Sequence, residues 1–336
     1  VAEKNIYASE QMLLPFSEKA LPEKGKDEKQ AGITRQGNQV VVSGDNFAVT
    51  FDMTSGMMTS YKHAGKELVR SGLKPDFWRP PTDNDYGNDM PVILADWKKA
   101  GEKAVVVSSA TKQHGKAIVV SFVYDIPGND GRKIASFSTD YSVEGDGSVD
   151  VRNSFTKTDK TLKALPRVGM QMQMPPEYGN IKWYGRGPQE SYADRKSSAF
   201  VGLYESTVPE QYFPYVRPQE NGYRSDARWL ILTDREGTGL KIVGEPLFCF
   251  AALNNTHDDF ESGVKLSEYR SDAKNVNKHI NDVKPGDFVN LNIDFGQMGV
   301  GGDDSWGAPV HPEYCLLKDK YEYSFRMVPV DKPENP

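Results

Sequence analysis

Residues 117–156, AIVVSFVYDIPGNDGRKIASFSTDYSVEGDGSVDVRNSFT, decide the fold. Within them, residues 117–124, 135–143 and 149–156 alternate apolar and polar side chains with the two-residue period of a half-buried β-strand. The segments GNDG and GDG between these runs have the composition of tight turns. Strands joined by such short turns run in opposite directions, so this part of the chain predicts an antiparallel meander.

Strand-like runs recur on both sides of the meander. They are residues 39–42, 47–52, 58–62, 104–108, 167–174, 181–184, 229–233, 240–243, 248–253, 288–295, 314–317 and 321–328. Only residues 91–100 indicate a helix, with Asp89 available as its cap and Gly101 at its end. Because helices do not alternate with strands, we expect an all-β fold, a large antiparallel β-sandwich with one short helix.

Composition excludes several classes of protein. The chain of 336 residues has a formal charge of −6 and no cluster of Lys and Arg interleaved with aromatics, so we expect no nucleic-acid partner. No run of apolar residues is long enough to cross a membrane. The thiols Cys249 and Cys315 lie in apolar runs and are expected to be buried rather than paired. The five histidines lack the spacing of metal ligands, so no metal site is expected.

Two long connections, residues 185–228 and 254–287, are rich in Gly, Pro, Asn and Tyr. Loops of that length in a compact domain usually serve a function or contact another domain.

The strongest candidate for a functional feature is the loop at residues 296–309, GQMGVGGDDSWGAP, which follows the strand-like run 288–295. Glycines permit positive φ angles and close backbone approach, and Asp and Ser side chains hydrogen-bond nearby amides. Such a loop can hold the indole ring of Trp306 in a fixed position. We therefore predict a substrate-binding group that consists of Trp306, Asp303, Asp304 and Ser305.

Four motifs follow one another along the chain: the first is RPPTDNDYG (79–87), the second WYGRGPQESYADR (183–195), the third YVRPQENGYR (215–224), and the fourth GVGGDDSW in this loop. Together they resemble the C-terminal domain of LacZ-type family 2 β-galactosidases. That domain is called the small chain when it is a separate polypeptide. The resemblance implies a galactose-mutarotase-like β-sandwich. It also implies that the two catalytic glutamates lie on an upstream (α/β)-barrel, so that this chain holds no catalytic residue and is inactive alone.

The resemblance further implies a division of the chain and a set of partners. Residues 1–16 would end a preceding immunoglobulin-like domain, 17–31 would be a polar linker, 32–330 the β-sandwich, and 331–336 a tail. The intact enzyme would cleave terminal β-D-galactosides with retention, bind magnesium and sodium mainly in other domains, and form a homo-oligomer. The cytoplasm and the periplasm both remain open as its compartment.

Two motifs also suggest chemistry of their own. Glu190 and Asp194 could form the carboxylate pair of a glycosidase, but Arg186 and Arg195 lie close in sequence, and ion-paired structural carboxylates are the favoured interpretation. Residues 82–89, TDNDYGND, suggest calcium, yet the EF-hand spacing fails, and a loop that caps the following helix is favoured.

Two rival functions remain open. A self-contained carbohydrate-binding module would need a complete sugar-binding face within this chain. An epimerase would need its own acid and base, and His257 with Asp258 and Asp259 could be the remnant of a sugar pocket, although a polar loop histidine is the favoured interpretation.

Overall fold

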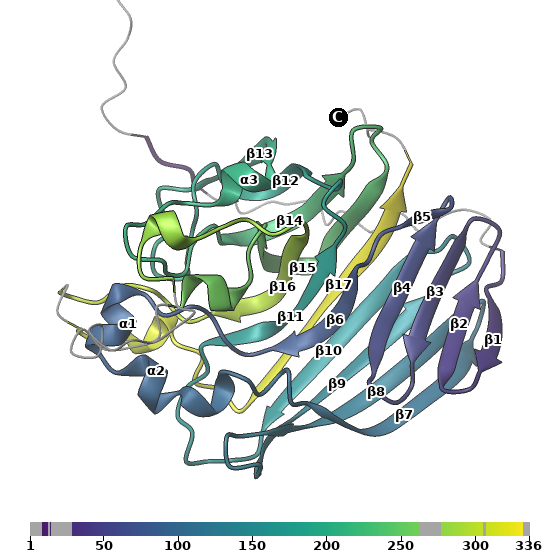
Figure 1. Cartoon of the computed structure of the whole chain (residues 1–336), viewed down its shortest axis with the longest axis horizontal. Coiled ribbons are helices and arrows are strands. Elements are labelled where there is room, and N and C mark those ends of the chain that lie inside the picture. The colour runs from purple at the N-terminus through teal and green to yellow at the C-terminus, as the bar shows by residue number, and fades with distance from the viewer. Residues whose placement is uncertain (1–8, 13, 15–28, 262–276, 305–306, 332–336) are drawn as a thin grey trace, which may run out of the picture.

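The computed structural model describes residues 9–12, 14, 29–261, 277–304 and 307–331. These residues form two antiparallel sheets, one of five strands and one of twelve. Figure 1 shows the smaller sheet, in purple, crossing one end of the larger sheet, and the short helices gathered at the opposite end. The expected all-β sandwich is confirmed.

The smaller sheet is a simple meander in which each strand pairs with the next along the chain. Its strands are β1 Gly32–Gln36, β2 Gln39–Ser43, β3 Phe47–Asp52, β4 Met57–His63 and β5 Lys66–Glu67. Along β2 and β3, alternate residues are buried, because one face of the sheet packs on the larger sheet and the other faces solvent.

The larger sheet has the strand order β13-β12-β14-β15-β17-β10-β9-β8-β7, and β11, β16 and β6 pair off this path. Its strands are β6 Ser71–Asp76, β7 Val105–His114, β8 Ala117–Pro127, β9 Lys133–Val143, β10 Val149–Lys157, β11 Arg167–Met174, β12 Asn180–Gly187, β13 Phe200–Thr207, β14 Arg224–Thr233, β15 Gly239–Leu253, β16 Val289–Gln297 and β17 Lys320–Val330. The meander predicted for residues 117–156 is β8, β9 and β10.

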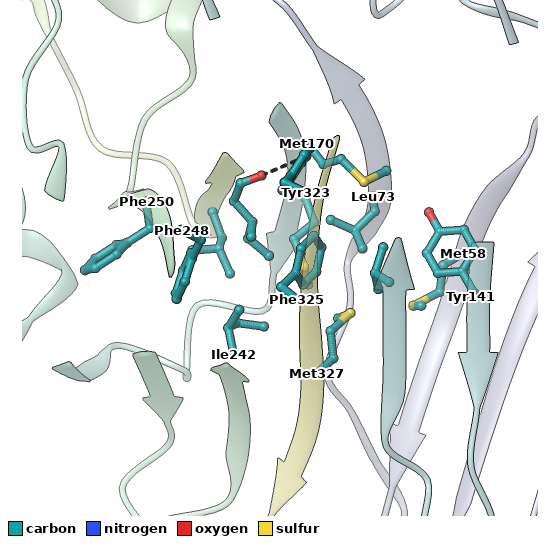
Figure 2. Close-up of a cluster of buried hydrophobic side chains, with 14 of the residues drawn as sticks. Met58, Leu73, Tyr141, Met170, Ile242, Phe248, Phe250, Tyr323, Phe325 and Met327 are labelled. Atoms are coloured by element: carbon teal, nitrogen blue, oxygen red, sulfur yellow. Dashed lines mark hydrogen bonds between the residues drawn. The ribbon is translucent and has the colours of Figure 1, made fainter. Parts of the chain in front are cut away.

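One continuous apolar core joins the two sheets. The ring of Phe51 on β3 lies 5.1 Å from that of Tyr141 on β9 and 6.4 Å from that of Phe122 on β8. Hydroxyl groups also bridge the layers, since Tyr124 donates to the carbonyl of Gly56 at 2.7 Å. Figure 2 follows this core from Phe250 on β15 to Met58 and Tyr141 at the other end.

The prediction of one helix over residues 91–100 is wrong. The structure has α1 Asp83–Gly87, α2 Met90–Ile93 and the 3₁₀ turn η1 Ala95–Trp97 instead. The chain leaves helical geometry at Leu94, with φ −106° and ψ 16°. This break allows the ring of Trp97 to be fully buried and to donate to the carbonyl of Ala164 at 3.0 Å.

Two further expectations need correction. Residues 185–228 are not a continuous loop, because they contain β13 and the short helix α3 Val208–Gln211. Every residue of β13 is at least partly exposed, so the strand lacks the alternation that would have predicted it. Residues 314–317 form no strand, but end the 3₁₀ turn η4 Pro312–Tyr314 and contribute one bridge, from Leu316 to Leu165.

The predicted boundaries between the N-terminal strand, the linker and the β-sandwich lie only partly within the described residues. Gln11 lies against the free edge of β13, where its side-chain amide both donates to and accepts from the backbone of Val201, at 2.9 and 2.7 Å. Ala31, at the end of the predicted linker, is buried and donates to the carbonyl of Lys116 at 3.3 Å. The boundaries at 1–16, 17–31 and 331–336 remain predictions.

Both cysteines are free thiols, as expected, but they are only partly buried, so the expectation of full burial is wrong. Within the described part of the chain, no helix is long and apolar enough to span a membrane.

Candidate functional site

The glycine-rich loop begins where β16 ends, and its first residues are held by backbone contacts. The amide of Met298 donates to the carbonyl of Pro166 at 2.9 Å, and that of Gly299 donates to the carbonyl of Tyr314 at 2.9 Å. The chain that leads to Trp306 therefore leaves the sheet in a defined direction.

Asp194 holds the next two residues. Its Oδ1 accepts a hydrogen bond from the amide of Val300 at 3.1 Å, and its Oδ2 accepts one from Gly301 at 2.7 Å. A carboxylate that receives two backbone amides makes strong, charge-assisted hydrogen bonds. A Cβ at Gly299 would lie 2.5 Å from the Asp194 carboxyl carbon, so this close grip needs glycine there. The second motif thus fixes the fourth.

The buried ion pair of Arg79 and Asp85 also holds this loop. Arg79 and Asp85 are 0% and 1% exposed, and both guanidinium Nη atoms donate to the carboxylate. The Nη2 of Arg79 also donates to the carbonyl of Gly299 at 3.0 Å. One arginine therefore links the first motif to the glycine-rich loop.

Asp85 has a second role, at the start of α1. Its carboxylate accepts from the amide of Thr82 at 2.8 Å, and the hydroxyl of Thr82 accepts from the amide of Asp85 at 3.3 Å. This reciprocal arrangement is a capping box, which satisfies the free amides at a helix start. Residues 82–89 do contain a helix cap, as favoured above, although the capped helix is α1 within the motif.

The far end of the loop rests on α1. Gly307 has a φ of +111°, and a Cβ there would lie 2.4 Å from the carbonyl carbon of Gly87. Only glycine fits both conditions without strain. The residue directly after Trp306 is therefore pinned to the end of the first motif.

The third motif packs on α1 from the other side. Arg217 donates to Asp83 at 3.2 Å, and its guanidinium lies 3.7 Å from the ring centre of Tyr86. Gln219 also bonds to Asp83, through both its amide and its carbonyl groups. These contacts bring the first and third motifs together.

A pocket of about 170 Å³ lies where all four motifs meet. Its lining residues come from every one of them: Thr82, Asp83, Asn84, Tyr192, Arg195, Tyr215, Gln219, Glu220 and Val300. The four motifs, which lie far apart in the chain, thus meet at one surface of the fold. We call this surface the four-motif face.

The predicted substrate-binding residues divide into two pairs. Asp303 is exposed and contacts the ring of His311 at 2.8 Å, and Asp304 accepts from the amide of Ala308 at 3.1 Å. Ser305 and Trp306 lie outside the described residues. The role of all four in sugar binding stays a prediction.

The carboxylates of the second motif are structural, as favoured above, but not with all the expected partners. Glu190 pairs with Arg195, accepts from the hydroxyl of Tyr215, and accepts from the amide of Gly222 at 2.9 Å. Asp194 holds the loop amides. Arg186 pairs with Asp226 at 2.6 Å, a residue far along the chain, and so the expected local pairing of Arg186 is wrong.

Sequence reasoning missed a buried polar cluster around Arg167, at the start of β11. Its guanidinium lies 3.0 Å from Asp76 on β6, 3.3 Å from Asp294 on β16 and 3.7 Å from Glu220. His257 contacts it at 2.8 Å, so this histidine is part of a buried network rather than a free loop residue. Charged residues inside otherwise apolar strands were the only signal in the sequence.

The cluster holds more carboxylates than cations, and burial shifts their titration. Burial raises the pKa of Asp294 well above its usual value, and it also raises the pKa of Glu220. Burial lowers the pKa of His257 to about 4, so its ring is neutral at neutral pH. Both oxygens of Asp294 lack a hydrogen-bond partner in the part of the chain that the structure describes, although the Nε of Arg167 lies 3.3 Å from its Oδ2.

Asp294→Asn is expected to stabilise the protein increasingly as the pH rises above about 4, the usual pKa of a free aspartate. The raised pKa means that Asp294 favours folding while it is protonated, and that this contribution is lost as the pH rises through its pKa in the folded state. The gain is about 1.4 kcal/mol for each pH unit between the two pKa values. Urea unfolding at several pH values measures it.

A constant difference between Asp294→Asn and the wild type across the pH range would contradict the assignment.

Among the described residues, no group of three or more His, Cys, Asp or Glu side chains is arranged to hold a metal ion.

The overall fold matches solved epimerases. A galactose 1-epimerase from Lactobacillus acidophilus superposes with a TM-score of 0.51 at 8% identity, covering 90% of this chain and 99% of that one. A putative aldose 1-epimerase from Escherichia coli gives 0.50 at 12% identity, with 89% and 99% covered. At such low identity the likeness shows the fold alone, which is galactose-mutarotase-like as expected.

Sequence comparison gives closer relatives. A β-galactosidase from Priestia megaterium is 32% identical over 324 residues, and one from Vibrio cholerae is 31% identical over 301 residues. These alignments cover 96% and 87% of this chain but only 29% and 27% of the relatives. The chain therefore spans less than a third of the length of the curated relatives that it matches.

The model of the β-galactosidase small chain matches residues 43–327, which include all four motifs, strands β3 to β16 and most of β17. The chain belongs to the β-galactosidase small-chain family.

Proposed function

We propose that this chain is the non-catalytic C-terminal part of a retaining family 2 β-galactosidase, which hydrolyses terminal β-D-galactosides. In this proposal the loop at residues 296–309 completes the sugar-binding site, and Trp306 forms an apolar platform beneath the sugar. The chain covers 29% of the length of its relative from Priestia megaterium. In this proposal the catalytic glutamates, magnesium and sodium belong to the remainder of the enzyme. The intact protein is proposed to be a homo-oligomer.

One observation carries the proposal: Trp306 stands between two anchored segments. Asp194 holds Val300 and Gly301 before it, and Gly307 after it is packed against Gly87. A loop restrained on both sides can present an aromatic ring without a large loss of conformational entropy on binding. Membership in the small-chain family supports a sugar as the group that the ring meets.

The carboxylates of the four-motif face support a non-catalytic role. Glu190 receives hydrogen bonds from Arg195, Tyr215 and Gly222, and Asp194 receives two from loop amides. Carboxylates whose oxygens accept several hydrogen bonds from the protein hold parts of the fold in place. The chain alone is therefore proposed to be inactive toward galactosides.

The two rival functions have less support. An epimerase would need its acid and base in an open site, but His257 is held against the buried Arg167. A self-contained binding module would need the described residues alone to bind galactosides, whereas Trp306 is proposed to act on a sugar held mainly by the remainder of the enzyme.

In the intact enzyme, Trp306→Ala is expected to weaken the binding of substrate and galactose analogues roughly tenfold. Contact of roughly 60 to 80 Å² between the indole and the sugar contributes about 1.5 to 2 kcal/mol. Trp306→Phe should be intermediate, because it keeps part of the platform. Steady-state kinetics and inhibitor titration measure the effect.

The melting temperature separates this function from a structural role. It should hardly change in Trp306→Ala, since a ring that meets substrate is not part of the core. A variant that melts far below the wild type but keeps a normal KM and kcat would show that Trp306 is a packing residue.

A further inference from the structure

A second pocket adjoins the four-motif face and has a volume of about 390 Å³. It shares Arg195 and Tyr215 with the smaller pocket at that face. Its other lining residues are Pro188, Gln189, Glu190, Ser198, Glu210, Gln211, Tyr212, Phe213 and Arg224. The volume lies within the range of about 300 to 1,000 Å³ that is usual for small-molecule sites.

Arg224, the first residue of β14, is the unusual member of this lining. It is 4% exposed, and its guanidinium lies 5.4 Å from the ring centre of Trp183. Its hydrogen bond is a 3.3 Å contact to the carbonyl of Tyr223, and its Nε has no partner among the described residues. No carboxylate of the described chain lies within ion-pair distance of it.

The other buried arginines are compensated. Arg79 pairs with Asp85, and Arg167 pairs with Asp76 at 3.0 Å, whose pKa is lowered from its usual value. A buried charge without a counterion costs several kcal/mol, which is why such groups are normally paired. Arg224 is therefore a buried cation whose counterion is missing from the described residues.

The acidic residues of the pocket do not supply that counterion. Glu190 is bound by Arg195 and by the hydroxyl of Tyr215. Glu210 closes the capping box of α3 through the amide and hydroxyl of Thr207, both at 2.9 Å. Burial lowers the pKa of Arg224 to about 10 and outweighs the charge of Glu190, which favours the protonated form of Arg224.

The other side chains that line the pocket include polar and aromatic groups. The Oε1 of Gln211 and the hydroxyl of Tyr212 are buried without a hydrogen-bond partner. The ring of Phe213 is 52% exposed and lies 4.5 Å from that of Tyr215. The exposed ring of Phe213 is an aromatic wall that can meet the C–H face of a ligand.

We propose that this pocket binds a carboxylate, with Arg224 as the residue that pairs with it. Two sources have this chemistry: a free acidic sugar, and an Asp or Glu side chain from the remainder of the enzyme. The site is separate from the Trp306 loop, and it does not depend on the role proposed for that loop.

Calorimetric titration of the chain with D-galacturonate tests the site, with D-galactose as the neutral match and the ionic strength held constant. Galacturonate is expected to bind about tenfold or more tightly than galactose, because the arginine adds charge-assisted hydrogen bonds. Arg224→Gln should remove this preference, and Arg224→Lys should keep part of it. The control Arg35→Gln, on the exposed strand β1, should leave binding unchanged.

Melting curves identify any variant that fails to fold. If Arg224→Gln does so, Phe213→Ala replaces it, because this half-exposed ring contributes a wall of the pocket and should weaken galacturonate binding while the fold is retained. Equal affinity of the wild type for galacturonate and galactose, or an unchanged galacturonate affinity in a folded Arg224→Gln or Phe213→Ala variant, would overturn the proposal.

The same titration of the intact enzyme distinguishes the two sources. Binding of galacturonate there identifies a free acidic ligand. Loss of binding in the intact enzyme, with binding retained by this chain, identifies a pocket already filled by an acidic side chain of the remaining domains. Either result leaves the Trp306 proposal untouched, because Trp306→Ala is tested by its own kinetics.

Discussion

Arg79→Met is expected to lower the free energy of unfolding by about 3 to 5 kcal/mol. The substitution leaves Asp85 buried, at 1% exposure, without its cation. It also removes the hydrogen bond to the carbonyl of Gly299. The loss should exceed that of any surface ion pair, because the carboxylate cannot recover its hydration while the fold persists.

Urea unfolding of this chain measures the effect, and Arg70→Met is the matched control. Arg70 pairs with Asp287 on the surface, where the two side chains are 45% and 83% exposed. Exposed pairs contribute about 0 to 1 kcal/mol. Similar losses for the two variants would show that the Arg79–Asp85 pair does not stabilise the four-motif face.

Gly72→Ala is expected to cost about 3 kcal/mol or more, and to do so through the junction of the two sheets. A Cβ at Gly72 on β6 would lie 1.6 Å from the carbonyl oxygen of Met58 on β4. Overpacking costs about 1 to 3 kcal/mol where side chains can yield, and here the obstacle is backbone. The strand that crosses from the smaller sheet to the larger one would have to shift.

Gly296→Ala is the matched control for this substitution. A Cβ at Gly296 meets nothing within 4 Å, and the residue is not among those with positive φ. Thermal melts of the two variants should differ clearly, with Gly296→Ala close to the wild type. Equal melting temperatures would contradict the close packing of β4 on β6.

Much of the fold could be predicted from the sequence because its strands are half-buried. The alternation in β8, β9 and β10 reports burial on one face, and the predicted runs match these strands closely. The same logic fails at β13, an edge strand that is partly exposed throughout. It also cannot place β17 beside both β10 and β15, because strand pairing over such separations leaves no local pattern.

The candidate site could be predicted in its parts but not in its assembly. Glycines and acids marked the loop around Trp306, and the motifs marked Asp194 and Arg79. The grip of Asp194 on Val300 and Gly301 spans 106 and 107 residues, so only the fold reveals it. The Arg167 cluster was missed for the same reason, since its charges come from three strands and two loops.

In the proposed function, the four-motif face acts on the sugar by holding the Trp306 loop. A double-mutant cycle of Asp194→Ala and Trp306→Ala in the intact enzyme tests it most directly, with affinity for a galactose analogue as the measurement. Asp194→Ala alone should weaken binding, because it releases the amides of Val300 and Gly301. In the Trp306→Ala background the same change should have almost no further effect. Additive losses from the two substitutions would contradict the account, because Asp194 would then act on binding by a route that does not pass through Trp306.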